Sequence, residues 1–175
     1  MENQNTISLG QKAPDFEADI YENGEFKKFK FSNNNGKWTV LFFYPLDFTF
    51  ICPTEIRSFA KYESKFNELG AQVIGASTDS VHSHKAWFQK ELPEVKFPVI
   101  ADTTHKVSRL FGVLKEDEGI AYRGTFILDP EGVLRYSLIS DLDVGRSVEE
   151  TIRVLEALKN GGLCPVEWKP GEETL

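Results

Sequence analysis

The chain has 175 residues, the length of one ordinary domain, and its 41% hydrophobic and 27% charged residues exclude disordered, collagenous and coiled-coil proteins. No apolar run approaches the roughly 18 residues of a membrane span, and the first residues lack a secretory signal. The net charge of −7 disfavours nucleic acid or an anionic membrane surface as a partner. These features predict a soluble, cytoplasmic protein.

The most basic stretch, residues 27–30, alternates like a strand, and its charges are typical of a solvated sheet edge. Further along, short apolar runs predict five strands, three of them apolar enough to be buried on both faces. The predicted strands are residues 38–44, 72–77, 97–101, 125–128 and 133–140.

Helical patterns separate these strands, at residues 53–69, 80–91, 104–111 and 148–159. The last begins with a capping box, in which Ser147 is followed three residues later by Glu150. Gly161 and Gly162 follow it and predict its end.

Strands that alternate with helices predict an α/β fold with a parallel or mixed central β-sheet flanked by helices. The turn Asp129-Pro130-Glu131-Gly132 joins the last two strands as a hairpin, so this part of the sheet is expected to be antiparallel. A βαβ unit followed by a hairpin and a terminal helix matches a thioredoxin-like fold by analogy. Residues 1–160 are expected to form this domain, and residues 161–175 a C-terminal tail.

The chain has two cysteines, Cys52 and Cys164, too few for a disulfide scaffold and without the spacing of a zinc site or a thioredoxin-type dithiol. Taken alone, such cysteines are most simply inert buried thiols. The histidines His82, His84 and His105 are more typical of structural roles than of a metal site. We therefore expect no metal and no cofactor.

The segment around Cys52 favours a reactive thiol instead. A buried strand leads into YPLDFTFICPTE, residues 44–55, in which Pro53 suits the first position of a helix. This arrangement predicts Cys52 at the N-cap and Glu55 at the third helical position, a capping box with sulfur in place of oxygen. Because helix N-termini favour anions, a thiolate fits that position better than a thiol.

Ionisation alone does not make a fast thiol enzyme. An ordinary thiol is already a few per cent thiolate at neutral pH, so full ionisation gains only about 30-fold. Groups that stabilise charge in the transition state must supply the rest. The sequence offers the Thr49 hydroxyl, the apolar wall of Pro45, and Arg123 at the start of a core strand.

The pattern Pro45-x-x-x-Thr49-x-x-Cys52 resembles the active-site signature of peroxiredoxins, in particular the typical two-cysteine group that includes alkyl hydroperoxide reductase C. The resemblance covers nearly the whole chain. Its further motifs are GQKAPDF (10–16), HKAW (84–87), YRGTF (122–126), VGRSVEET (144–151) and CPVEWKPG (164–171).

The resemblance implies a role for each matching residue. Cys52 would attack the peroxide as a thiolate and become a sulfenic acid, with Thr49 binding the peroxide and Pro45 shielding the pocket. Arg123 would polarise the O–O bond. Glu55 would orient Arg123, and Arg146 would be a second partner of Glu55. An ordinary salt bridge explains the presence of Arg146 nearly as well.

The resemblance also implies partners. Cys164 of a second protomer would resolve the sulfenic acid as an intersubunit disulfide, which thioredoxin or a dedicated flavoprotein reductase would reduce. The protein would then be a homodimer, with decameric rings as a further option. Two alternatives remain open: a one-cysteine peroxidase in which Cys164 plays no part, and a peroxide sensor or holdase without peroxidase turnover.

Overall fold

The computed structural model describes residues 6–175. Its strands are β1 (Glu17–Glu22), β2 (Glu25–Lys30), β3 (Trp38–Phe43), β4 (Ala71–Ser77), β5 (Val99–Ala101), β6 (Leu114–Lys115), β7 (Ile120–Ala121), β8 (Arg123–Leu128) and β9 (Leu134–Ser140). Its helices are α1 (Cys52–Lys61), α2 (Glu63–Glu68), α3 (Val81–Glu91), α4 (Lys106–Leu110) and α5 (Val148–Asn160), with a 3-10 helix η1 (Phe31–Asn34).

Seven strands form one mixed sheet in the order β2-β1-β5-β4-β3-β8-β9. Strands β3, β4 and β5 run parallel, whereas β8 is antiparallel to both β3 and β9. The turn between β8 and β9 is closed by the Asp129 carboxylate, which accepts hydrogen bonds from the backbone N–H groups of Glu131 and Val133. The predicted mixed sheet with a late hairpin is therefore confirmed.

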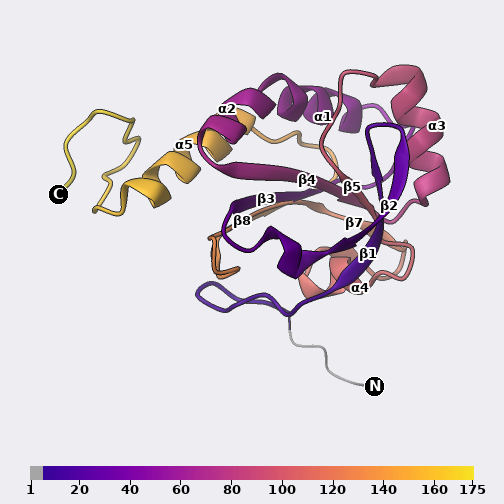
Figure 1. Ribbon diagram of the computed structural model, residues 1–175, viewed down its shortest axis with the longest axis horizontal. Coiled ribbons are helices and arrows are strands. Elements are labelled where there is room, and N and C mark those ends of the chain that lie inside the picture. Colours follow the sequence, from indigo (N-terminus) through magenta and orange to yellow (C-terminus); the bar gives the residue numbers. More distant parts are fainter. Residues whose placement is uncertain (1–5) are drawn as a thin grey trace.

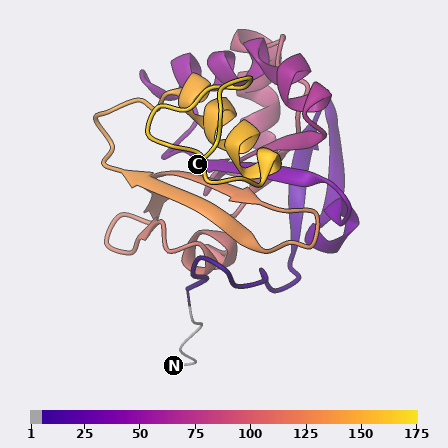
Figure 2. The same ribbon diagram turned by 90° about the vertical axis from the view of Figure 1, so that its left-hand side faces the viewer.

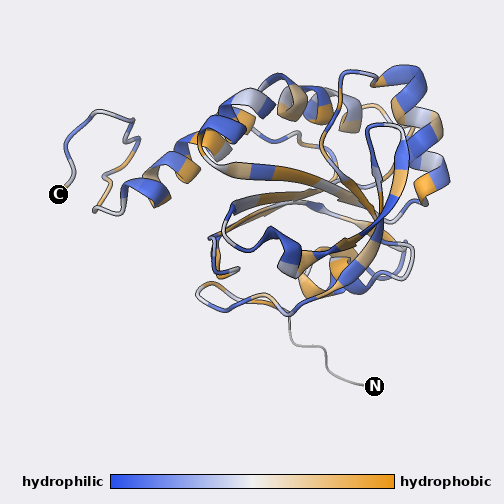
Figure 3. Cartoon of the chain, in the orientation of Figure 1, coloured by the Kyte–Doolittle hydropathy of each residue, from blue (hydrophilic) through white to orange (hydrophobic). Residues whose placement is uncertain are grey.

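The alternation of side chains along β3 explains why helices cover both faces of the sheet. Val40 and Phe42 point into one core cluster, while Leu41 and Phe43 point into a second cluster on the other face. Helices α1, α2, α3 and α5 lie over the first face and α4 lies over the second (Figure 1), a layering also visible from the side in Figure 2. Hydrophobic residues accordingly predominate in the central strands, and the helices carry both kinds (Figure 3).

The N-terminal hairpin was only half predicted. Strand β2 is the edge strand that the basic stretch indicated, because it heads the sheet order and exposes most of its side chains. Strand β1, which pairs with both β2 and β5, has no equivalent in the prediction. Its sequence EADIYE is rich in acidic residues, which are uncommon in strands, and its place is fixed by pairing partners distant in sequence.

The single helix expected at residues 53–69 is wrong, because the chain forms α1 and α2 with a bend at Tyr62. Tyr62 has a φ of −98° and a ψ of 7°, outside the regular helical range. Phe59 before the bend and Phe66 after it are both fully buried in the same core cluster. The bend therefore does not interrupt the buried face, and the hydrophobic pattern gives no sign of it.

Other element boundaries shift for local reasons. The strand expected from residue 97 begins at Val99, since Pro98 has no N–H to donate to a neighbouring strand. The helix expected from residue 104 begins at Lys106, after His105 with a φ of 60°. The Asp102 carboxylate accepts the N–H groups of its first turn. The short hairpin of β6 and β7 was not predicted.

The C-terminal tail lies beside α5. Gly161, with a φ of 73°, ends the helix as its sequence indicated. The Trp168 side chain is 3% exposed, and its carbonyl accepts a hydrogen bond from Arg153 of α5. In Figure 1 this tail projects beyond the sheet, at one end of the longest axis. None of the helices within residues 6–175 is long and apolar enough to cross a membrane.

Replacing Phe59 tests the core over the first sheet face. The Phe59 ring is fully buried and stacks on Phe42 with ring centroids 4.1 Å apart. Phe59→Ala should lower the free energy of unfolding of the reduced protein by about 3–5 kcal/mol, measured by chemical denaturation. Leu9→Ala, at a residue that is 61% exposed, should change it by less than about 0.5 kcal/mol. Equal effects of the two substitutions would contradict this description of the core.

Candidate active site

Cys52 lies where the chain passes from β3 to α1. It is the first helical residue, and the N-cap is Ile51, which makes no side-chain capping hydrogen bond. The prediction that Cys52 itself is the N-cap and that Glu55 closes a capping box is therefore wrong. The backbone carbonyl of Ile51 accepts the N–H groups of Thr54 and Glu55, while the Glu55 side chain is held by two arginines.

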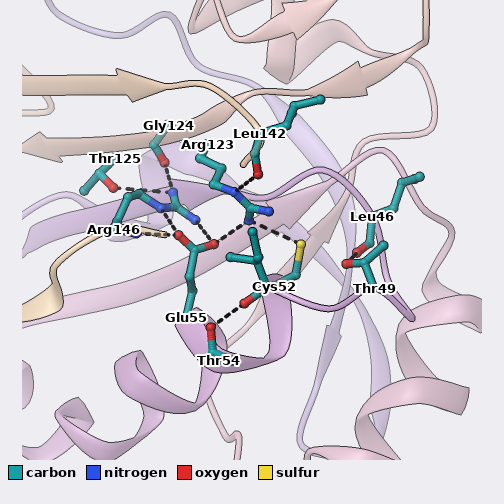
Figure 4. A network of polar contacts seen from close by, with 11 residues as sticks. Leu46, Thr49, Cys52, Thr54, Glu55, Arg123, Gly124, Thr125, Leu142 and Arg146 are labelled. Carbon is teal, nitrogen blue, oxygen red and sulfur yellow. Dashed lines mark hydrogen bonds and ion pairs between the residues drawn. The ribbon is translucent and has the colours of Figure 1, made fainter. Parts of the chain in front are cut away.

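The Cys52 side chain is fully buried and faces a cation. Its sulfur accepts a hydrogen bond from Nη1 of Arg123 at 3.4 Å (Figure 4). The N-terminus of α1, the positive end of the helix dipole, lies at the same residue. Both features favour a negative charge on the sulfur.

Glu55 joins the two arginines that the sequence indicated. Its Oε2 accepts Nη1 of Arg123 at 2.7 Å, and its two carboxylate oxygens accept Nε and Nη2 of Arg146 at 2.8 and 2.9 Å. Burial by itself raises the pKa of the Glu55 carboxyl. The hydrogen bonds and charge of Arg146, with the charge of Arg123, outweigh burial, so the pKa lies below its ordinary value of 4.5.

Backbone carbonyls hold both guanidinium groups in place. Nε of Arg123 donates to the carbonyl of Leu142 at 2.7 Å, and Nη1 of Arg146 donates to the carbonyl of Gly124 at 2.5 Å. Arg146 also lies over the Phe42 ring, 5.4 Å from its centroid. Sequence reasoning missed Leu142 and Gly124 as parts of the site, because a backbone carbonyl leaves no signature in residue type.

The charges of this cluster do not cancel when Cys52 is a thiol. The side chains of Arg123, Arg146 and Glu55 are 4%, 1% and 2% exposed, so two positive charges and one negative charge are buried together. One uncompensated positive charge in a buried site is costly. A Cys52 thiolate, in contact with Arg123, brings the buried cluster to neutrality.

Thr49 and Pro45 belong to the loop that precedes Cys52. Pro45 is buried just after β3, and the Thr49 hydroxyl donates a hydrogen bond to the carbonyl of Leu46 at 2.9 Å. In Figure 4 the Cys52 sulfur lies between Thr49 and the Arg123 guanidinium. The Thr49 hydroxyl, its proton engaged by Leu46, keeps its lone pairs free to accept a hydrogen bond from a bound molecule.

Cys164 is not part of this cluster. It is partly buried beside α5, where its sulfur faces the carbonyl of Ala157 at 3.8 Å. A cavity of about 510 Å³ at Cys164 is lined by residues of α5 and the tail. The structure thus brings Cys52, Glu55, Arg123 and Arg146 into one network with Thr49 and Pro45 alongside, and leaves Cys164 elsewhere.

The histidines do not assemble a metal site. Within residues 6–175 no group of three or more His, Cys, Asp and Glu side chains is arranged to hold a metal ion. His84 is buried and forms hydrogen bonds to Asp47 and Ile100. The sequence alone did not point to Asp47, and it suggested only a structural role for His84.

Comparison with known proteins finds relatives that cover most of the chain. The model of the AhpC/TSA family matches residues 9–137. The putative peroxiredoxin YkuU of Bacillus subtilis (strain 168) is 50% identical over 175 residues, covering 95% of this chain and 97% of that protein. Peroxiredoxin-2 of Mus musculus is 49% identical over 176 residues, covering 95% and 89%.

Solved structures agree. The crystal structure of Enterococcus faecalis AhpC superposes with a TM-score of 0.88 at 39% identity, covering 91% of this chain and all of that chain. The reduced 2-Cys peroxiredoxin of Plasmodium vivax superposes with a TM-score of 0.91 at 31% identity, covering 95% and 91%. The chain therefore belongs to the AhpC/TSA family, as a peroxiredoxin of the AhpC type with a thioredoxin fold. It is an enzyme, a thiol-dependent peroxidase.

Glu55→Gln tests the electrostatics of the cluster through acid stability. Because the pKa of Glu55 is lower in the folded than in the unfolded chain, its contribution to stability is present above the ordinary value of 4.5 and is lost as the pH falls through the folded pKa. The variant should lose about 3–5 kcal/mol of unfolding free energy at pH 7. Its stability should also fall less steeply than wild type below about pH 4.5, measured by denaturation at each pH.

Glu116→Gln is the matched control. Glu116 also pairs with an arginine, Arg109, and its pKa is also lowered, but its side chain is 62% exposed. Solvent screens such a pair, so the pH profile of this variant should follow wild type. Identical acid profiles for Glu55→Gln and wild type would contradict the account of Glu55.

Proposed function

We propose that Cys52 is the peroxidatic cysteine and that it attacks hydrogen peroxide or a small alkyl hydroperoxide as a thiolate. The observation that carries this proposal is the buried surplus of positive charge at the Cys52 sulfur. Among residues 6–175, no cationic side chain forms a hydrogen bond with the Cys164 sulfur, which faces a carbonyl instead. Arg153 lines the same cavity as Cys164, but of the two cysteines only Cys52 accepts a hydrogen bond from a buried arginine.

In the first step an electron pair of the thiolate forms a bond to one peroxide oxygen and the O–O bond breaks. The proton of the attacked oxygen passes to the other oxygen, which leaves as water or an alcohol. The sulfur is left as a sulfenate, which takes up a proton from the solvent to become the sulfenic acid. Negative charge moves from sulfur to the leaving oxygen during this step. Arg123, which already donates to the sulfur, is placed to stabilise that charge as it moves.

The remaining residues shape and orient the pocket. The Thr49 hydroxyl accepts a hydrogen bond from the peroxide and so fixes the oxygen that is attacked, and Pro45 excludes water from one side. Glu55 holds the Arg123 guanidinium group in place, and Arg146 in turn holds Glu55. Arg146 thus acts through Glu55 rather than by direct contact with the sulfur.

In the second step Cys164 of a partner protomer attacks the sulfenic acid, forming an intersubunit disulfide and releasing water. The position of the tail supports a partner as the source: in Figure 1 it leaves the body at one end of the molecule, whereas α1 begins at the far end of the central strands. The relative from Plasmodium vivax is named a 2-Cys peroxiredoxin, and a spinach chloroplast relative, 50% identical, has the same designation.

This chemistry needs at least a homodimer, and larger rings such as decamers would contain the same dimer. The disulfide must be reduced by an external dithiol, which thioredoxin or a dedicated flavoprotein reductase would supply. The negative net charge disfavours nucleic acid and anionic membranes as partners. Both steps use only protein sulfur and peroxide.

Thr49→Val tests the peroxide pocket. The substitution keeps the shape of the side chain and removes the hydroxyl, so the rate constant of Cys52 with hydrogen peroxide should fall by about 100-fold or more. Alkylation of Cys52 by iodoacetamide does not use that hydroxyl and should keep its rate. Stopped-flow tryptophan fluorescence and mass spectrometry measure the two reactions in a Cys164→Ser background.

Thr54→Val is the control for this experiment. Thr54 lies in the first turn of α1 and donates its hydroxyl to the carbonyl of Ile51, away from the sulfur. It should leave the peroxide rate within about twofold of wild type. A peroxide rate unchanged by Thr49→Val would remove Thr49 from the pocket.

Cys164→Ser tests the second step. The variant should still be oxidised at Cys52 by the first equivalent of peroxide, but the sulfenic acid should persist and be trapped by dimedone. Turnover with thioredoxin should fall to background, because no disulfide forms. Full thioredoxin-linked turnover by the variant would establish a one-cysteine mechanism instead, and Cys52→Ser should abolish both reactions.

A further inference from the structure

Asp47 lies in the middle of the loop that carries Pro45 and Thr49, and it is almost completely buried. Its side-chain oxygens accept hydrogen bonds from the Tyr44 hydroxyl at 2.7 Å and the Ser83 hydroxyl at 2.8 Å, and one of them forms a hydrogen bond with Nδ1 of His84 at 2.8 Å. The side chains of Asp47 and His84 are 1% and 0% exposed. These three hydrogen bonds fix the Asp47 side chain in one place inside the protein.

Both nitrogens of the His84 ring face oxygen atoms that accept hydrogen bonds. Nδ1 faces the Asp47 carboxylate, and Nε2 faces the backbone carbonyl of Ile100 at 3.2 Å. The His84 ring thus links Asp47 of the loop to Ile100 of β5 inside the protein.

The backbone of Asp47 is tied down separately. Its N–H donates to Oδ2 of Asp79 at 2.9 Å, and the same oxygen accepts the Ser77 hydroxyl at 2.7 Å. Burial, together with the charge of Asp47, raises the pKa of Asp79. Through Asp47 the loop is thus fastened to the end of β4 and to the first turns of α3.

The next residue, Phe48, shows why such fastening is needed. Phe48 has a φ of 56°, in the left-handed region that a residue with a side chain rarely adopts. Its side chain is 53% exposed and packs near the Trp87 ring, at 5.8 Å between ring centroids. A strained backbone persists only where its surroundings over-determine it, and here the contacts of Asp47 do so.

We propose that the hydrogen-bonded pair of Asp47 and His84 is a positioning device for the peroxidase reaction. It holds the loop of residues 45–51 in its strained form and thereby places Thr49 and Pro45 against the Cys52 sulfur. Neither Asp47 nor His84 has a hydrogen bond to Cys52 or Arg123, so the pair acts through the loop. This inference rests on the proposed role of Thr49 in binding peroxide.

The test compares two reactions of Cys52 in Asp47→Asn and His84→Gln, each in a Cys164→Ser background. The rate constant with hydrogen peroxide should fall roughly 10- to 100-fold, because the Thr49 hydroxyl is no longer held in place. Alkylation of Cys52 by iodoacetamide, which needs the thiolate but not the loop, should change by less than about threefold. A parallel loss of both rates would show a merely structural role and overturn the proposal.

Thr39→Val is the control for loss of a buried hydrogen bond as such. Thr39 is buried on β3 and accepts a hydrogen bond from Asn34, remote from the loop. This variant should be destabilised and yet keep both rates. If it slowed the peroxide reaction as much as Asp47→Asn, global destabilisation would explain the effect and the proposal would fail.

A double variant asks whether Asp47 acts through Thr49. In a Thr49→Val background the hydroxyl to be positioned is absent, so adding Asp47→Asn should slow the peroxide reaction by no more than about threefold further. Fully multiplicative losses would mean that Asp47 acts independently, against the proposal. If wild type and Thr49→Val react equally, the proposed role of Thr49 fails by itself.

Discussion

The active site depends on a charge imbalance: two buried guanidinium groups share a single carboxylate. Glu55 pairs with both guanidinium groups, but it neutralises only one of their two charges. The backbone carbonyls of Leu142 and Gly124 hold the arginines in place without adding a counter-ion. The Cys52 sulfur is in contact with Arg123, and in the proposed mechanism a thiolate at this position would neutralise a cluster that is otherwise positively charged.

The fold produces this imbalance by bringing three separate segments to one end of the sheet. Strand β8 lies next to β3 in antiparallel register, with Gly124 opposite Phe43, so Arg123 lies just beyond the end of β3. The same end of β3 leads through the loop into α1, which supplies Cys52 and Glu55. Arg146 comes from the segment before α5 and closes the cluster over Phe42.

Much of this arrangement could be predicted from the sequence. The features that could be predicted depend on local patterns, and those that could not depend on contacts between distant residues. The buried strands are short apolar runs, and the chemistry of Cys52 is concentrated in twelve residues, 44–55, so local patterns reveal both. The role of Glu55 was predicted in two incompatible ways. Its spacing from Cys52 indicated a capping box, whereas in the structure the carboxylate forms hydrogen bonds with arginines 68 and 91 residues away. Features that depend on distant contacts, such as strand β1 beside β5 and the hydrogen bond between Asp47 and His84, 37 positions apart, have no counterpart in the local pattern.

The most direct test of the central claim is to find which sulfur peroxide oxidises first. The reduced protein, freed of reductant, would receive one equivalent of hydrogen peroxide per protomer and be analysed by mass and peptide map under non-reducing conditions. The expected product is a covalent dimer in which Cys52 of one protomer is linked to Cys164 of the other. An unchanged mass, or oxygen on Cys164 with Cys52 still reduced, would contradict the central claim.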